Sequence, residues 1–259
     1  MTACQRFEGL RKLSTDPAAK ILAAAGVKLQ TPLEAPASAG VPRVLAELAG
    51  KGARLDMLQL LAHALPAREA TWWACLSARD LCAGGRPSAA VAAAEAWVMR
   101  PGPETRARAR EALDAAGDDD AGLCAMAACF ADGTLGPGEL DDYAAPAGAV
   151  GGAVFGMALL SLFDEAADPD RRGAWLLDRA LDLARGGAGQ VPAPEGGDAP
   201  ADASQADASP AGASRREVFP TDASGGEVSG EGASQGKGPP ADASGGGVPC
   251  GVAPAEGRS

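Results

Sequence analysis

The chain has 259 residues and a mass of 25.7 kDa, enough for one ordinary domain or two small ones. It carries 34 Asp and Glu residues against 23 Lys and Arg, which gives a formal net charge of −11 at pH 7. An acidic chain without a basic cluster repels a phosphate backbone, so we expect no nucleic-acid binding. The N-terminal sequence MTACQRFEGLRKLSTD is charged where a secretory signal would be apolar, so we expect a cytoplasmic protein.

Residues 1–40 form an N-terminal segment that we expect to be only partly helical. Asp16-Pro17 is a suitable cap and first residue for a short helix that ends at Gly26. A loop rich in Pro and Gly follows as far as residue 40. The sequence leaves open whether this segment docks on the rest of the chain.

Residues 41–186 have the spacing of an all-α domain. No window alternates apolar and polar residues with the period of two that marks a β-strand. Short turns separate the apolar stretches, so we predict about eight helices in a compact domain of antiparallel helical hairpins. The helices expected here are 42–50, 55–65, 68–82, 87–99, 103–116, 118–131, 149–166 and 169–185.

Residues 187–259 differ sharply in composition and predict a disordered acidic tail. They are rich in Gly, Ala, Ser, Pro, Asp and Glu and contain one aromatic residue, Phe219. Residues 201–250 align as five blocks of ten, each with Ala-Ser at its third and fourth positions. Because almost nothing in a block can be buried, the blocks indicate a disordered repeat, with a linker or partner-docking arm as the functional alternative.

Residues 65–81, LPAREATWWACLSARDL, hold two of the four tryptophans, Trp72 and Trp73. A tryptophan pair on one helix marks the centre of a core or a contact surface. Arg68 and Arg79 are eleven residues apart and so share one stripe of the helix, as Glu69 and Asp80 share the next. We favour a core helix whose charges pair at its two ends. The alternative is an interface of the hot-spot type, with Arg68, Glu69, Trp72 and Arg79 as contacts to a protein partner.

The sequence offers no catalytic, cofactor-binding or metal-binding constellation. His63 is the only histidine, and we expect it to be a half-buried or surface residue of its helix. Without a second histidine or a C-x-x-C pair, a zinc site of the usual kind is excluded. The six cysteines, at 4, 75, 82, 124, 129 and 250, are too irregular for a disulfide framework, and those in apolar helices behave as small hydrophobic residues.

Residues 144–163 contain no charge, which raises a membrane alternative. An uncharged stretch of this length matches a bilayer span, with 147–163 as the tether. Pro146 shortens the usable helix, and the flanks lack the positive charge that would orient a span. We therefore expect a central buried helix whose glycines allow close approach of neighbouring helices.

Several stretches carry a family resemblance: HALPAREATWWACLSAR at 63–79, AAEAWV at 93–98, ADGTLGPGEL at 131–140, AVGGAVFGMALL at 149–160 and LDRALDLARGG at 177–187. On them, the run from Leu58 to about Gly187 resembles an uncharacterised bacterial family of purely helical proteins. This family often accompanies type VI secretion components and their effectors. The resemblance implies a small cytoplasmic accessory protein that handles secreted cargo, and it supplies no catalytic residues.

Our leading hypothesis is therefore a non-enzymatic helical adaptor or chaperone-like protein, linked to type VI secretion cargo. The rival hypothesis is a small enzyme that uses carboxylates or Arg side chains of an interhelical groove. A membrane-tethered protein is the third class.

Overall fold

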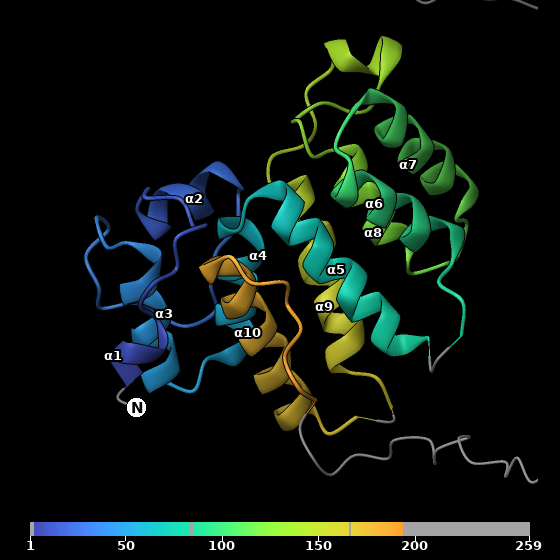
Figure 1. The fold of residues 1–259 in the computed structure, drawn as a ribbon. Coiled ribbons are helices and arrows are strands. Elements are labelled where there is room, and N and C mark those ends of the chain that lie inside the picture. Colours follow the sequence, from blue (N-terminus) through green and yellow to red (C-terminus); the bar gives the residue numbers. More distant parts are fainter. Residues whose placement is uncertain (1–2, 83–84, 166, 194–259) are drawn as a thin grey trace, which may run out of the picture. The chain divides into compact units, whose positions relative to one another are not determined.

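A computed structural model describes residues 3–82, 85–165 and 167–193 of the chain (Figure 1). The chain divides into two units, Met1–Ala203 and Ser204–Ser259, and the second lies wholly outside the described residues. Most of the predicted disordered tail, residues 194–259, also lies outside them.

The described residues form helices joined by turns, with two isolated β-bridges, Pro17–Gly40 and Thr134–Ala144, as their only β contacts. The predicted all-α fold is confirmed. The helices are α1 (Ala3–Arg6), α2 (Ala18–Ala24), α3 (Val41–Gly50), α4 (Arg54–Ala64), α5 (Ala67–Leu81), α6 (Ala89–Met99), α7 (Pro103–Ala115), α8 (Gly122–Cys129), the 3-10 helix η1 (Gly138–Asp142), α9 (Ala149–Leu162) and α10 (Pro169–Arg185).

Helix ends follow the expected chemistry at several places. Prolines lie in the first turn of α3, α7 and α10, where the missing N–H has no partner to lose. The side chain of Asp168 caps α10 by accepting hydrogen bonds from the backbone N–H groups of Asp170 and Arg171. Gly186 ends α10 in the left-handed conformation, with φ of 98°, as a glycine at this position should.

Other boundaries differ from those predicted. Asp16 does not cap α2, because Pro17 occupies the cap position and the Asp16 carboxylate pairs with Lys20 at 2.9 Å. The acidic run 118–120 precedes α8 instead of starting it, and Asp119 accepts the N–H of Ala121 in a local turn. Helix α9 ends at Leu162, before the charged residues that follow it, whereas the sequence predicted an end at 166.

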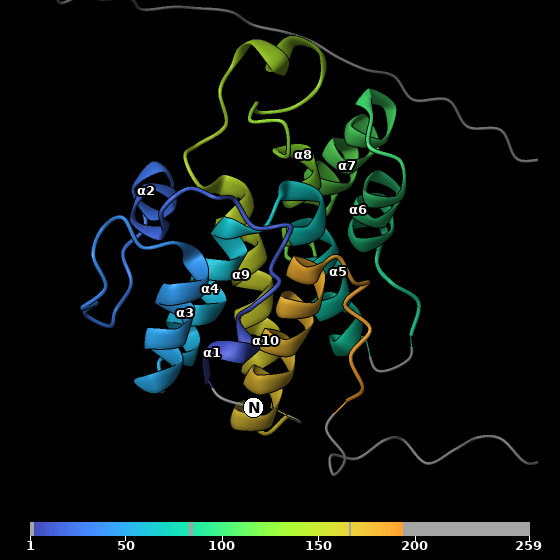
Figure 2. The same cartoon turned by 60° about the vertical axis from the view of Figure 1, so that its left-hand side comes forward.

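Helix α9 lies at the centre of the packing. It contacts α4, α5, α8 and α10, with α6 and α7 beyond α8 on one side and α3 beyond α4 on the other (Figures 1 and 2). The predicted central helix is confirmed. Two glycines at its start approach neighbours closely: a Cβ on Gly148, the residue before the helix, would lie 2.7 Å from the Ala25 carbonyl oxygen, and a Cβ on Gly151 would lie 2.1 Å from His63 Nδ1. No helix in the described ranges has the length and apolar character to cross a bilayer.

The N-terminal segment packs on this helical domain. Phe7 and Leu22 are buried within the common core, and the N–H of Lys12 donates to the carbonyl of Ala184 at the end of α10, 2.8 Å away. Helix α1 contacts α3, and α2 contacts α4. The first described residues therefore extend the core over one side of the bundle.

Two carboxylates fix the loop between α2 and α3. Buried Asp56 on α4 accepts the backbone N–H groups of Gln30 and Thr31, both at 2.8 Å. Glu47 on α3 accepts those of Glu34, at 2.6 Å, and Ala35, at 2.8 Å. The Lys51 ammonium beside Glu47 and these backbone donors lower the pKa of Glu47 from 4.5 to about 2.

Four cysteines of the helical domain are free thiols in or near the core. Cys75, Cys124 and Cys129 are buried and Cys82 is half-buried. A hydrogen bond with Cys124, together with burial, raises the pKa of the Cys75 thiol. Thiols in such apolar surroundings pack as small hydrophobic side chains.

Candidate functional site

The two adjacent tryptophans of helix α5 lie in different environments. The Trp73 side chain is 0% exposed and belongs to the core. The Trp72 side chain is half-buried, and its indole N–H donates to the carbonyl of Ala188, 2.8 Å away in the segment that follows α10. Trp72 is thus covered by the chain itself.

The charged residues predicted beside the tryptophans also have partners within the chain. Arg68 and Arg79 lie on one stripe and both face α6, where Arg68 donates to the Val98 carbonyl at 2.7 Å and Arg79 pairs with Glu95. Glu69, on the next stripe, pairs with Lys12 of the N-terminal segment at 2.9 Å. The four predicted contact residues Arg68, Glu69, Trp72 and Arg79 therefore all make intrachain contacts in this structure.

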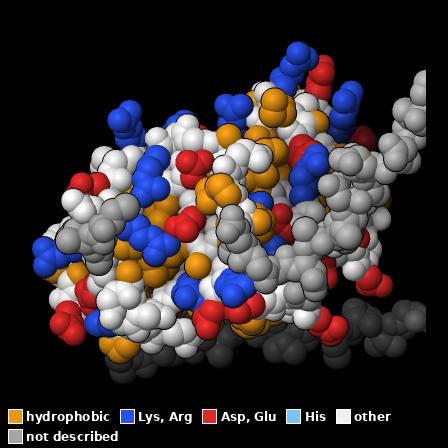
Figure 3. Space-filling model, turned by 60° about the horizontal axis from the view of Figure 1, so that its bottom comes forward, with side chains coloured by type: hydrophobic (Ala, Val, Ile, Leu, Met, Phe, Trp, Pro, Cys, Tyr) orange, Lys and Arg blue, Asp and Glu red, His pale blue; other side chains and the backbone are white. Residues whose placement is uncertain are grey.

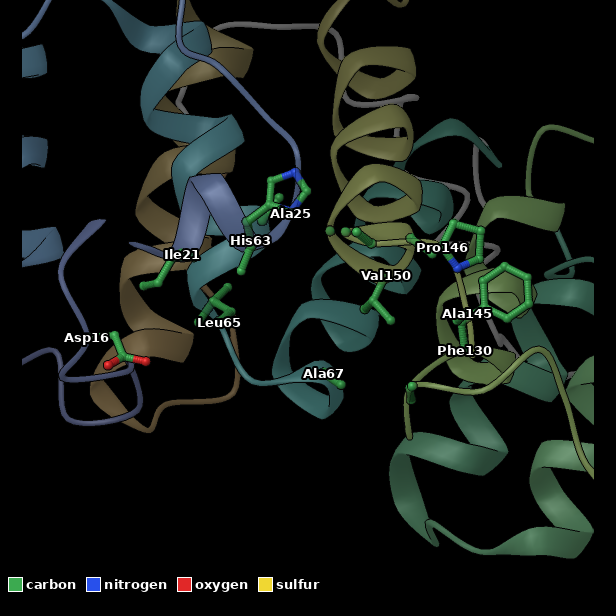
Figure 4. A pocket seen from close by; sticks show the side chains of 18 of the residues that line it. Asp16, Ile21, Ala25, His63, Leu65, Ala67, Phe130, Ala145, Pro146 and Val150 are labelled. Carbon is green, nitrogen blue, oxygen red and sulfur yellow. The ribbon is translucent and has the colours of Figure 1, made fainter. Parts of the chain in front are cut away.

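A cleft of about 520 Å³ opens between α2 and α4 on one side and the start of α9 and end of α8 on the other (Figure 4). Small and apolar residues make up most of its wall. Ile21 and Leu65 line one side, and Val150, Pro146 and Phe130 line the other. Three of the stretches on which the family resemblance rests, around residues 63–67, 131–133 and 149–151, contribute to this lining.

His63 is the polar side chain farthest inside the cleft. Burial lowers the pKa of its imidazole below the ordinary 6.5, so the ring is neutral at physiological pH. Gly151 makes room for the ring, since a Cβ there would lie 2.1 Å from His63 Nδ1. The predicted half-buried helical position of His63 is what the structure shows.

The remaining charged side chains of the lining are Asp16 and Lys20, which pair with each other at 2.9 Å on exposed positions. In the described lining, Asp16 is the only carboxylate and no arginine is present. The cleft therefore offers an apolar surface with one neutral hydrogen-bonding ring.

A buried arginine holds the loop that forms the lower wall of the cleft. Arg106 on α7 is 5% exposed, and its Nε donates to the Cys129 carbonyl at the end of α8, 2.6 Å away. Its guanidinium also pairs with Asp132 and, at 2.7 Å, with Asp141 of η1. That guanidinium lowers the pKa of Asp141. Arg106 thus connects both ends of the loop that runs from α8 to η1.

Sequence reasoning did not find this arginine or the cleft. In the sequence, Arg106 lies in the run PETRARAR, which looks like a solvated helix face. Cleft residues come from four separate segments. Most of these residues are Ala, Gly or Pro, which carry no chemical signal. His63, as the only histidine, was the one sequence signal of this site, and its position on a helix does not by itself reveal the cleft.

The surface shows no single-sign patch on the face in Figure 3, where Lys and Arg side chains are interspersed with Asp and Glu and with small apolar areas. Within the described ranges, no group of three or more His, Cys, Asp or Glu side chains is arranged to hold a metal ion.

Comparison with known proteins gives one match. A model of the family of unknown function DUF6931 matches residues 44–184, which cover α4 to α9 and most of α3 and α10. No curated protein and no solved structure matches significantly. The N-terminal wall of the cleft, α2, lies outside the matched range. Because the match spans more than half of the sequence, this chain belongs to DUF6931, a family of unknown function.

Proposed function

We propose that this protein is a non-enzymatic helical adaptor or chaperone-like accessory protein that holds an apolar segment of a protein partner. The observation that carries the proposal is the lining of the cleft between α2, α4 and α9, which is largely apolar and small-residue in character. Burying an apolar segment there stabilises a complex by about 25 cal/mol per Å² removed from water.

The polar groups of the cleft suit recognition better than chemistry. An enzyme site needs convergent groups that donate, accept or stabilise charge at one reacting atom. His63 is neutral, and the only carboxylate of the described lining, Asp16, is paired with Lys20 at the rim. The rival enzyme hypothesis, which needs groove carboxylates or arginines, therefore finds little support here.

The proposal places the partner contact in the cleft, while the predicted contacts of α5 have intrachain partners. Arg68, Glu69 and Arg79 hold α6 and the N-terminal segment in place. Their substitution would affect the stability of the domain more directly than the binding of a partner.

The class of partner is proposed from the family resemblance of the sequence. The resemblance implies a family that often accompanies type VI secretion components and effectors, so we propose secretion cargo, bound in the cytoplasm, as the partner. This step rests on the resemblance alone, and the cleft supports only the more general role of binding an apolar segment.

The test is affinity capture with a variant that changes the lining of the cleft. Val150→Asp puts a charge into the cleft at the first turn of α9, where an acidic side chain is favourable to the helix. Met99→Asp is the matched control, because Met99 is 73% exposed at the end of α6 and does not line the cleft. Both variants are immobilised beside the wild type and exposed to lysate of the native organism.

We expect the wild type and Met99→Asp to retain the same protein partner and Val150→Asp to lose it. Identification of that partner as a secretion effector or component supports the finer proposal. A partner retained equally by Val150→Asp contradicts binding in the cleft. A small metabolite that co-purifies with the wild type and is released by Val150→Asp, with no protein captured, favours the enzyme hypothesis.

A further inference from the structure

Residues 187–191, here called the strap, turn back after α10 and run between α10 and α5 (Figures 1 and 2). Four hydrogen bonds hold the strap, and in the first the Gly187 N–H donates to the Asp182 carbonyl at 2.9 Å. The Trp72 indole N–H donates to the Ala188 carbonyl at 2.8 Å, and the Trp175 indole N–H donates to the Val191 carbonyl at 3.0 Å. Asp182 accepts the N–H of Gly189 at 2.8 Å. The sequence placed the start of the tail at 187, yet these residues contact the domain.

The two indoles bind the strap through its backbone. Their donors meet the carbonyls of Ala188 and Val191, so these two bonds read no side chain of the strap. Selection by side chain occurs at Gly189, which is buried and has a φ of 72°. A Cβ at this position would lie 2.7 Å from Leu76 Cδ1 and 3.3 Å from Leu183 Cγ. The surface therefore accepts a glycine there and excludes larger residues.

The surface beneath the strap is built by the helices themselves. Arg179 on α10 is 8% exposed, and its guanidinium lies 3.6 Å from the centre of the Trp175 ring. Arg179 also pairs with Asp80 on α5 at 2.6 Å. Stacking on a buried and paired guanidinium fixes the indole, so its N–H is oriented by α5 and α10 and not by the strap.

The strap is bound to the domain by few hydrogen bonds for the number of residues that it orders. A net hydrogen bond stabilises by about as much as the ordering of one residue costs, or somewhat less, and here four bonds order five residues. Two of those residues, Gly187 and Gly189, lose the most conformational freedom on docking. A segment that brought the same contacts and further apolar surface would displace the strap.

We propose that Trp72, Trp175 and Asp182 form a second protein-binding site, the indole clamp, for a partner segment that bends as the strap does. The segment carries glycine directly after the residue whose carbonyl accepts the Trp72 indole N–H. The strap is an in-chain occupant that shows the chemistry of the ligand and competes with it. This site is separate from the cleft and does not depend on the function proposed for the cleft.

The test uses the full-length chain and the synthetic peptide GGAGQVPA, which copies residues 186–193. Gly189→Val removes the in-chain competitor, because valine fits neither the positive φ nor the contact with Leu76. Gln190→Val is the matched control at an exposed neighbouring position. Titration is followed by NMR at the indole N–H signals, which report the donors of Trp72 and Trp175 directly.

We expect the indole signals of Trp72 and Trp175 to shift in Gly189→Val and to return toward their wild-type positions as peptide is added. The peptide should bind Gly189→Val at least ten-fold more tightly than the wild type or Gln190→Val. The peptide GGAVQVPA, which has valine in place of the glycine equivalent to Gly189, should not bind.

Two outcomes would overturn the proposal. If Gly189→Val leaves both indole signals unchanged, the clamp does not select glycine. If those signals shift but the peptide does not restore them, or if the valine peptide binds equally well, the surface is only a packing site for the strap. Capture experiments on the cleft read out a different surface, so failure here leaves them unaffected.

Discussion

Substitution of Gly148 by alanine should destabilise the domain at the junction of α2 and α9. Gly148 has a φ of 70°, and a Cβ there would lie 2.7 Å from the Ala25 carbonyl oxygen and 3.2 Å from Ala25 Cα. The left-handed conformation costs an alanine about 1–2 kcal/mol. Because the neighbour is backbone and not the end of a flexible side chain, overpacking adds about 1–3 kcal/mol.

The expected total is a loss of about 2–5 kcal/mol, or a fall in Tm of about 4–20 °C for a domain of this size. Gly152→Ala is the matched control on the same helix, because no atom lies within 4 Å of its Cβ position and its φ is not positive. Alanine should stabilise that site by about 0.5–1 kcal/mol. Both effects can be measured by urea and thermal unfolding followed by circular dichroism at 222 nm. Equal stability of the two variants would refute the close approach of α2 to α9.

Four further predictions test other parts of the structure. Arg106→Met should destabilise the domain by about 1–3 kcal/mol in urea unfolding, because it removes the hydrogen bonds to Cys129 and Asp141 but leaves Asp141 exposed to water. Amide hydrogen exchange should also rise in residues 131–143, and unchanged exchange there would contradict the anchoring role of Arg106. Since burial lowers the pKa of His63, the folded state binds fewer protons than the unfolded state as the pH falls below 6.5. The contribution of His63 to stability is therefore complete above pH 6.5 and is lost as the pH falls through the lower pKa of the folded state. His63→Gln should flatten the pH dependence of Tm in that window, and an unaltered slope would show that the ring is solvated. The pKa of Glu47 is about 2 against an ordinary 4.5, so the contribution of Glu47 to stability is complete above pH 4.5 and declines toward pH 2. Glu47→Gln should reduce the loss of stability over that range, and the same acid sensitivity in both proteins would argue against the Glu47 contacts. Truncation after residue 193 should change stability by no more than about 0.5 kcal/mol, since the removed sequence has little apolar surface; a large fall in Tm would show that residues beyond 193 stabilise the domain.

Much of the helical layout could be predicted because its signals are local. Prolines, the Asp168 cap and the Gly186 stop lie within a turn of the ends they set. Helix α8 was predicted too long because its acidic leader suits a helix start, whereas Asp119 forms a turn of its own with Ala121. Local chemistry permits both outcomes there, and packing of the apolar residues 122–129 decides between them.

The stripes of α5 were also predictable, since helical geometry fixes which residues share a face. Arg68 and Arg79 do face the same neighbour, α6, although no sequence pattern identifies Val98 or Glu95 as their partners. The Trp72 environment was beyond reach for a similar reason. Its hydrogen-bond partner, Ala188, lies 116 residues away in a stretch whose composition predicts disorder.

The candidate site could not be predicted because its parts are chemically plain. Gly148 and Gly151 have no side chains, and this absence lets Ala25 and His63, from distant segments, lie against the start of α9. Only tertiary contacts reveal such a site. The same contacts assign Asp56 and Glu47 their anchoring roles, which depend on the path of a loop more than ten residues away.

The most direct test of the proposed function is site-specific photo-crosslinking in living cells of the native organism. A photoreactive amino acid replaces Ala147, which is exposed and lines the cleft, or Met99 as the control outside it. We predict a discrete protein adduct from position 147 that is absent from position 99 and is lost when Val150→Asp is added. The absence of any protein adduct at position 147, or the same adduct from both positions, would contradict the cleft as a partner-binding site.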